Sequence, residues 1–177
     1  MADESYVAVA AQYSGEELAV ADFDQLRAHY KENERHEHGP FDAAVINRGV
    51  DGELSIVRRD DGGKSHGTRK GLSIGLASGL AVALFPAVAL GGALLAAGGT
   101  GAGIGAVAGH IARRTPSKDL AVISETLDAG SAGIVLVVDP ADVDEVMQLL
   151  PNATRTTRTD LAVDREELDR DVDDSYE

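Results

Sequence analysis

The sequence predicts an α+β protein in which a small α/β domain is interrupted by a glycine-rich helical hairpin. Three observations lead to this fold class. Short apolar segments rich in β-branched residues alternate with segments of helical periodicity. Residues 71–109 contain no formal charge, although 26% of the chain is charged. Within that stretch small residues recur at every fourth position, which places them on one face of a helix.

The segments before the glycine-rich stretch are predicted as a strand, a helix and two strands. Residues 5–13 are apolar and partly β-branched, which favours a buried strand. Ser14 and Glu17 have the spacing of a capping box, so a helix is expected over residues 15–32. Asp51-Gly52 has the chemistry of a hairpin turn. It separates two further predicted strands, residues 41–47 and 54–58.

The segments after the stretch continue the same alternation. A helix is predicted from Pro116 to Ala129, with Gly130 as its stop. Residues 132–138 form a continuous apolar run, as expected for a central strand. A third helix begins at Asp139-Pro140, and residues 154–159 are a candidate edge strand.

This order of elements is that of a ferredoxin-like split βαβ domain. We expect the domain to be discontinuous, over residues 5–66 and 115–150, with the hairpin (67–114) inserted between strand 3 and helix 2. Such a domain has its helices on one face of the sheet. The other face would be polar or covered by a partner, which favours a homo-oligomer.

Seven glycines follow the four-residue spacing on the two arms of the hairpin. A helix face made of glycine lets another helix approach closely and pack by van der Waals contact. We therefore predict helix packing and self-assembly along Gly67, Gly71, Gly75, Gly79, Gly101, Gly105 and Gly109.

The hairpin is predicted to lie in a membrane. Its uncharged length is about twice the ~20 residues that span a bilayer once. Glycine costs a helix about 1 kcal/mol relative to alanine in water, so lipid or tight burial must enforce helicity. Arg69 and Lys70 precede the stretch, and Arg113 and Arg114 follow it. A hairpin brings these pairs to the same side, which the positive-inside rule makes cytoplasmic.

Two alternatives to the membrane hairpin stay open. Residues 96–103 are weakly hydrophobic, which favours a soluble oligomer with the hairpins buried between its subunits. Such an oligomer would be a ligand-binding or regulatory protein. A flexible linker is less consistent with the strict spacing, because a spacer needs no register. The turn of the hairpin falls at Phe85-Pro86 or at Gly91-Gly92.

Composition limits the partners of the chain. The formal net charge of −14 argues against nucleic-acid binding, which needs a basic face. Without cysteine there is no disulfide, thiol nucleophile or Cys-bound metal. The N-terminus lacks the pattern of a signal peptide. The acidic residues 160–177 are predicted to be a disordered tail or a solvated helix.

No pattern of residues predicts an enzyme, a cofactor or a small-molecule ligand. Gly63-Lys64-Ser65 resembles the end of a P-loop, but Arg58 stands where that loop needs glycine. Residues 101–105 do not follow a strand, as a dinucleotide-binding turn would. His36 and His38 lack enough further ligands for a metal site; Glu34, Glu37 and His66 are the nearest additions. His110 is interpreted as a boundary residue, with pH sensing as the alternative.

Five segments together resemble a family of bacterial and archaeal "uncharacterised membrane proteins" with a domain of unknown function. They are YVAVA, ADFDQL, FDAAVINR, LFPAVALGGALLAAGGTGAGIGAVAGHIARR and SETLDAGSAGIVLVV, within residues 5–150. The resemblance implies an α/β domain with a glycine-rich insert and membrane association, and no established activity. A more distant similarity to general stress proteins implies a stress role. We thus expect a non-enzymatic, membrane-associated, self-assembling protein.

Overall fold

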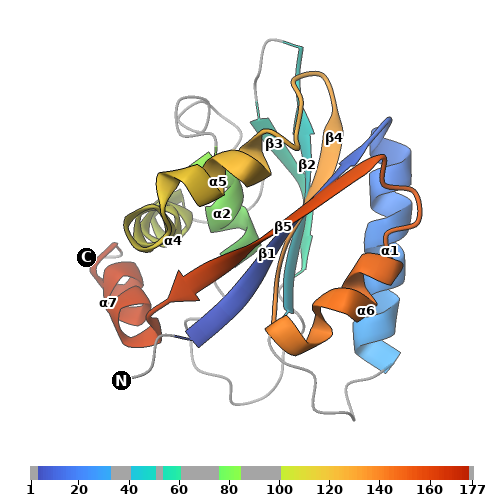
Figure 1. Ribbon diagram of the computed structural model, residues 1–177. Helices are drawn as coiled ribbons and strands as arrows, with labels where there is room; N and C mark the ends of the chain where they lie inside the picture. Colours follow the sequence, from blue (N-terminus) through green and yellow to red (C-terminus); the bar gives the residue numbers. More distant parts are fainter. Residues whose placement is uncertain (1–3, 33–40, 51–53, 61–75, 85–100, 176–177) are drawn as a thin grey trace.

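A computed structural model describes residues 4–32, 41–50, 54–60, 76–84 and 101–175 of the chain. These residues form one antiparallel sheet between two layers of helices (Figure 1). The α+β class is therefore confirmed.

The sheet has five strands in the order β3-β2-β4-β1-β5, and every neighbouring pair is antiparallel. The central strand β4 is buried along its whole length, as its continuous apolar sequence predicts. Because β1 and β2 both run antiparallel to β4, they share one direction and have β4 between them. The strands are β1 (Glu4–Tyr13), β2 (Phe41–Arg48), β3 (Leu54–Asp60), β4 (Ala132–Val138) and β5 (Arg155–Val163).

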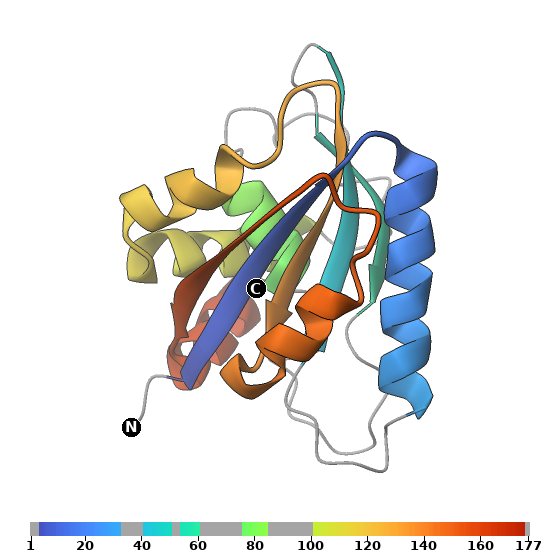
Figure 2. The ribbon, with the colours of Figure 1, turned by 45° about the vertical axis from the view of Figure 1, so that its right-hand side comes forward.

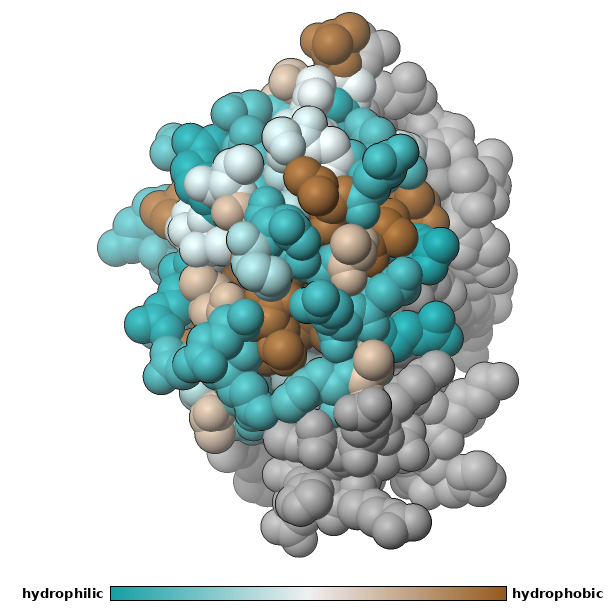
Figure 3. Space-filling view, turned by 90° about the vertical axis from the view of Figure 1, so that its right-hand side faces the viewer, coloured by the Kyte–Doolittle hydropathy of each residue, from teal (hydrophilic) through white to brown (hydrophobic). Residues whose placement is uncertain are grey.

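One face of the sheet is covered by α1 (Glu16–Glu32), the 3-10 turn η2 (Pro140–Asp142) and α6 (Val143–Gln148). Figure 2 shows α1 and α6 side by side on this face. Phe23 and Leu26 of α1 pack with Val146 of α6 against the strands. Hydrophilic residues cover most of the outer surface of this layer, with apolar residues between them (Figure 3). Asp139 caps η2 by accepting a hydrogen bond from the Ala141 amide at 2.9 Å, as expected for a helix start here.

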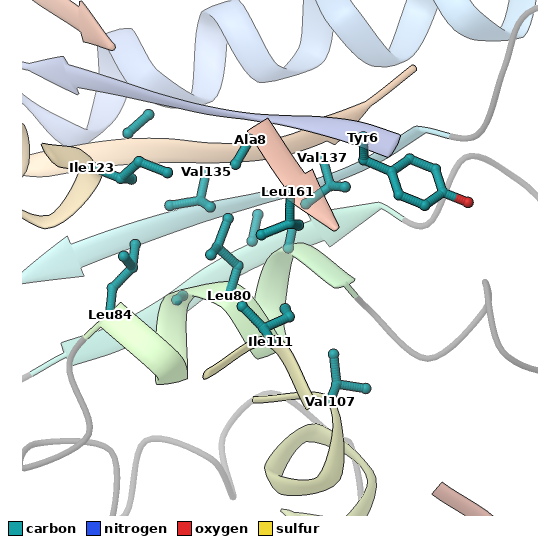
Figure 4. Packing of buried hydrophobic residues seen from close by; sticks show 14 of the residues in the cluster. Tyr6, Ala8, Leu80, Leu84, Val107, Ile111, Ile123, Val135, Val137 and Leu161 are labelled. Carbon is teal, nitrogen blue, oxygen red and sulfur yellow. The ribbon is translucent and has the colours of Figure 1, made fainter. Parts of the chain in front are cut away.

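Within the described parts of the chain, four helices cover the second face of the sheet. Leu80, Leu84 and Ile111 direct their side chains toward Val135 and Leu161 of the sheet (Figure 4). The expectation of helices on one face only is therefore wrong. Alternate residues of the strands are apolar on both sides, so both faces need cover. The four helices are α2 (Leu76–Leu84), α4 (Gly101–Arg114), α5 (Ser117–Ser124) and α7 (Arg165–Ser175).

The predicted membrane location is also wrong. Among the described residues, no helix combines the length and the apolar character needed to cross a bilayer. α2 has 9 residues and α4 has 14. At 1.5 Å per residue these helices are about 14 and 21 Å long, against about 30 Å of hydrocarbon. Their apolar side chains are used instead to bury the sheet.

The acidic C-terminal segment, expected to be a disordered tail or a solvated helix, contains a helix that packs on the domain. β5 extends to Val163, beyond the predicted edge strand, and α7 follows directly. Leu161, Val163 and Leu168 are buried, and these apolar side chains hold the segment on the domain.

Candidate functional site: the α4–α7 charge cluster

The start of α7 is fixed by its own first residues. The Oδ1 atom of Asp164 accepts a hydrogen bond from the Glu167 amide at 3.0 Å, which is the geometry of an N-cap. The carbonyl of Asp164 accepts from the Leu168 amide at 2.9 Å. The Glu167 amide, and then the Arg114 guanidinium, lower the pKa of the Asp164 carboxyl. Asp164 is therefore charged at neutral pH and oriented toward α4.

Two arginines at the end of α4 pair with the carboxylates of α7. Arg114 contacts Glu167, and its Nη2 atom lies 3.2 Å from Asp164 Oδ2. Arg113 contacts Asp171, and its Nη2 atom lies 3.5 Å from Glu167 Oε1. The hydrogen bond from Arg114 is the main cause that lowers the pKa of Glu167. These residues, with His110, are called the α4–α7 charge cluster below.

His110 lies beneath the ion pairs and is fully buried. Its Nε2 atom is 3.2 Å from the Asp164 amide nitrogen, and its Nδ1 atom is 3.3 Å from Asp171 Oδ2. An amide N–H can only donate, so Nε2 carries the lone pair and Nδ1 carries the proton. His110 thus joins the N-cap residue Asp164 to Asp171 in the second turn of α7, and it is more than a boundary residue.

The cluster has the residue types of a cation site. Ligand atoms of His110, Glu167 and Asp171 lie within 4.8 Å of one another. Two features disfavour a metal ion there. The Nδ1 atom bears a proton in the hydrogen-bonded arrangement, and the two carboxylates already contact guanidinium groups. The geometry is that of a charge-paired helix contact.

The structure places two of the predicted glycine positions in detail. A Cβ atom at Gly79 would lie 2.3 Å from Cγ1 of Val107, so Gly79 permits close contact between α2 and α4 within one chain. Gly109 has more space, since its Cβ would meet only Arg113 Nη1 at 3.5 Å. Gly101 and Gly105 lie in the first turns of α4. Gly67, Gly71 and Gly75 lie outside the described residues.

The four predicted flanking cations have different outcomes. Arg113 and Arg114, expected at a membrane boundary, pair with α7 instead. Arg69 and Lys70 lie outside the described residues, as do residues 34–38 and 63–66, which were considered for metal and phosphate binding. The Gly-rich residues 101–105 belong to a helix, consistent with the argument against a dinucleotide-binding turn.

A second buried polar group was missed from the sequence. The carboxylate of Asp22 on α1 is fully buried and accepts from the Tyr13 hydroxyl at 2.9 Å. It also accepts from Asn152, at 3.0 Å from the amide and 2.7 Å from Nδ2. Burial, then the hydrogen bond to Asp22, raises the pKa of Tyr13. The helical spacing of Ala19, Asp22 and Leu26 was the available signal that Asp22 faces inward.

A groove lies beside β5 on the α6 side of the sheet. It has a volume of about 470 Å³. One of its lining residues, Arg158 of β5, pairs with Asp144 of α6 at 3.2 Å, and both side chains are more than half exposed. The groove is lined by Val7, Pro140, Val143, Arg158, Thr159 and Asp160.

Comparison of the chain with protein-family models, with curated proteins and with solved structures gives no match. The family resemblance of the five sequence segments therefore stays a prediction.

Proposed function

We propose that the protein is a non-enzymatic regulatory protein in which the docking and release of α7 on α4 is the conformational step. The observation that carries this proposal is the α4–α7 charge cluster, in which Arg113 and Arg114 hold the carboxylates of α7. Release of α7 would uncover a basic face on a chain of net charge −14. An acidic segment of another protein is the chemistry that this face would recognise.

The nature of the contact supports a reversible step. Arg113 is 54% exposed and Arg114 is 33% exposed, so water and salt reach their ion pairs. Exposed ion pairs contribute little to stability and weaken further with ionic strength. A helix whose charged contacts are of this kind responds to salt, to pH and to competing anions.

The length of α7 supports the same conclusion. An isolated helix shorter than about 12–15 residues is marginal in water, and α7 has 11 residues. Its order therefore depends on the contact with α4. Leu168 is the fully buried apolar side chain among the α7 residues with described surroundings. Burial of one leucine contributes about 1.5–3 kcal/mol, which is small beside the core of the sheet.

The fold proposed for the core is a ferredoxin-like split βαβ unit. It consists of β1, α1, β2, β4, α6 and β5, with β4 between β1 and β2 and with β5 beside β1. In this assignment the insert runs from β3 to α5. It starts one strand earlier than the sequence suggested, and α6 takes the place of the second helix. The self-assembly expected from the glycine pattern and the stress role expected from the resemblance remain proposals.

Hydrogen–deuterium exchange followed by mass spectrometry tests the regulatory proposal on the full chain. We expect the amides of α7 to exchange much faster than those of β4, and to exchange faster still as salt is raised. Replacing both arginines, Arg113→Gln and Arg114→Gln, should bring α7 close to the rate of an unstructured peptide. β4 should keep its protection, because the ion pairs described above join both arginines to α7 and its N-cap residue.

Arg170→Gln is the matched control. Arg170 is exposed on α7 and donates to the Glu166 carbonyl of the same helix at 3.3 Å, so its loss should leave α7 docked. If α7 is as strongly protected as β4 at low and high salt, α7 is a permanent part of the core and the proposal fails.

A further inference from the structure

The two edges of the sheet are built differently. In β3 the register shifts, because Val45 pairs with Arg58 while Ile46 pairs with Ile56, which leaves Val57 as a bulge. Arg58 is also tied to Asp24 of α1 at 3.3 Å. Bulges and charges of this kind protect a sheet edge from pairing with another chain. The β3 edge is therefore protected from pairing with a strand of another chain.

The β5 edge also carries charges, but it has no bulge. Its nine residues follow β1 without a register shift, from Arg155 opposite Gln12 to Val163 opposite Glu4. The strand contains no proline or glycine, and three of its residues are β-branched threonines. In Figure 1 the sheet is seen from this edge, with β5 in front and the helices to either side. No other described strand lies on the outer side of β5.

The charges on β5 are self-complementary. Arg158 is paired with Val9 and Asp160 with Val7, so both side chains point to the α1 and α6 side of the sheet. They border the open groove described above. The strand holds two arginines and one aspartate, so it is slightly basic in a chain whose net charge is −14.

Only one antiparallel register uses both charges. With a two-fold axis at Thr159, Arg158 of each copy lies opposite Asp160 of the other, and opposite charges across a strand pair are favourable. An axis at Arg158 would place the two copies of Arg158 opposite each other, and an axis at Asp160 would do the same for the two aspartates. An axis at Thr157 would place Arg158 opposite Thr156 and leave the aspartate without a cation.

We propose that β5 pairs antiparallel with β5 of a second copy of this chain, with Thr159 on the two-fold axis, so that the two sheets become one. The backbone groups of the outer edge supply the hydrogen bonds. The pairing of Arg158 in each copy with Asp160 in the other fixes the register of the two strands. Arg158 can leave Asp144 readily, since that pair is exposed. This surface is separate from the α4–α7 charge cluster.

Charge reversal tests both the interface and its register. The mass of the full chain is measured by light scattering after size exclusion at moderate salt. The native chain should be a dimer. Arg158→Glu and Asp160→Arg should each have half that mass, because each puts like charges opposite one another twice. An equimolar mixture of these two variants should regain the dimer, since each mixed pair is then opposite in charge. The double variant should also be a dimer.

Asp144→Asn is the control, because it removes the in-chain partner of Arg158 without changing β5, and it should leave the dimer intact. Recovery on mixing also excludes misfolding as the reason for the loss in the single variants. A monomeric native chain, single variants that remain dimeric, or a mixture that fails to pair would each overturn the proposal. The exchange rates of α7 do not enter this test, so its outcome is independent of the regulatory proposal.

Discussion

Gly79 of α2 lies so close to Val107 of α4 that a Cβ atom at position 79 would stand 2.3 Å from Cγ1 and 2.7 Å from Cβ of the valine. The backbone nitrogen of Ala108 would be 3.3 Å away, so the helix itself limits any adjustment. Gly79→Ala should destabilise the protein by about 1–3 kcal/mol, the usual effect of overpacking a core. Urea denaturation followed by circular dichroism measures this difference.

Gly109→Ala is the matched control for that substitution. Gly109 lies inside α4, and a Cβ there meets only Arg113 Nη1 at 3.5 Å. The helix propensity of alanine should then leave stability unchanged or raise it by up to about 1 kcal/mol. Equal losses from the two substitutions would show that helix propensity, and not the contact with Val107, sets the effect.

These two positions show what the glycine pattern could predict. The four-residue spacing correctly indicates that a helix can be approached closely, but it does not identify the approaching element. Lipid, a second subunit and another helix of the same chain all fit the same spacing. For Gly79 the neighbour is α4, and the apolar side chains next to it, such as Leu80, face the sheet. Long-range packing decides this, and no local pattern records it.

The strands could be predicted from the sequence, whereas the ion pairs of the charge cluster could not. Alternating or continuous apolar runs predict β1, β2, β3 and β4 close to their observed positions, because burial acts locally on each strand. Arg113 and Arg114 were identified as basic residues, but their partners were not. The spacing of Asp164, Glu167 and Asp171 by three and four residues was the signal for one face of a helix. The high acidity of the segment favoured disorder instead.

Gly130 is the described glycine with a positive φ angle, +80°, at the turn that leads into β4. A side chain in this left-handed conformation costs about 1–2 kcal/mol. A Cβ would also lie 3.4 Å from Cγ1 of Val50. Gly130→Ala should therefore lower the free energy of unfolding by about this amount, and Gly130→Asn should lower it less. Equal effects of Ala and Asn in thermal denaturation would contradict a conformational origin.

The buried pair of Tyr13 and Asp22 predicts sensitivity to alkali. Burial and the Asp22 carboxylate raise the pKa of Tyr13 above its ordinary value of 10.0. The unfolded chain therefore loses the tyrosine proton first, so the stabilisation is complete below pH 10 and declines as the pH rises above it. Tyr13→Phe should reduce this decline in the free energy of unfolding, measured by urea titrations over a series of alkaline pH values.

At neutral pH the same substitution should destabilise the protein by about 1–3 kcal/mol, because Asp22 loses a hydrogen-bond donor while it stays buried. Tyr30→Phe is a useful comparison. Burial, followed by the charges of Asp142 and Glu145, raises the pKa of Tyr30 as well, so Tyr30 contributes to the same alkaline decline. An alkaline decline that is unchanged in both variants would mean that neither tyrosine is responsible.

Acid should release α7 before it unfolds the sheet. The pKa of Asp164 lies below its ordinary value of 3.8, through the Glu167 amide and Arg114, and that of Glu167 lies below 4.5, mainly through Arg114. For a carboxyl with a lowered pKa, the stabilisation is present above the ordinary value and is lost as the pH falls through the lowered one. Both groups belong to the contact between α4 and α7, so protonation weakens that contact first.

We expect the amide resonances of α7 to move toward random-coil positions below about pH 4, while those of β4 stay dispersed. In Arg114→Gln the carboxyls lose their main cationic neighbour, so the same change should occur at higher pH. Simultaneous loss of the α7 and β4 resonances in both proteins would show that α7 unfolds only with the whole domain.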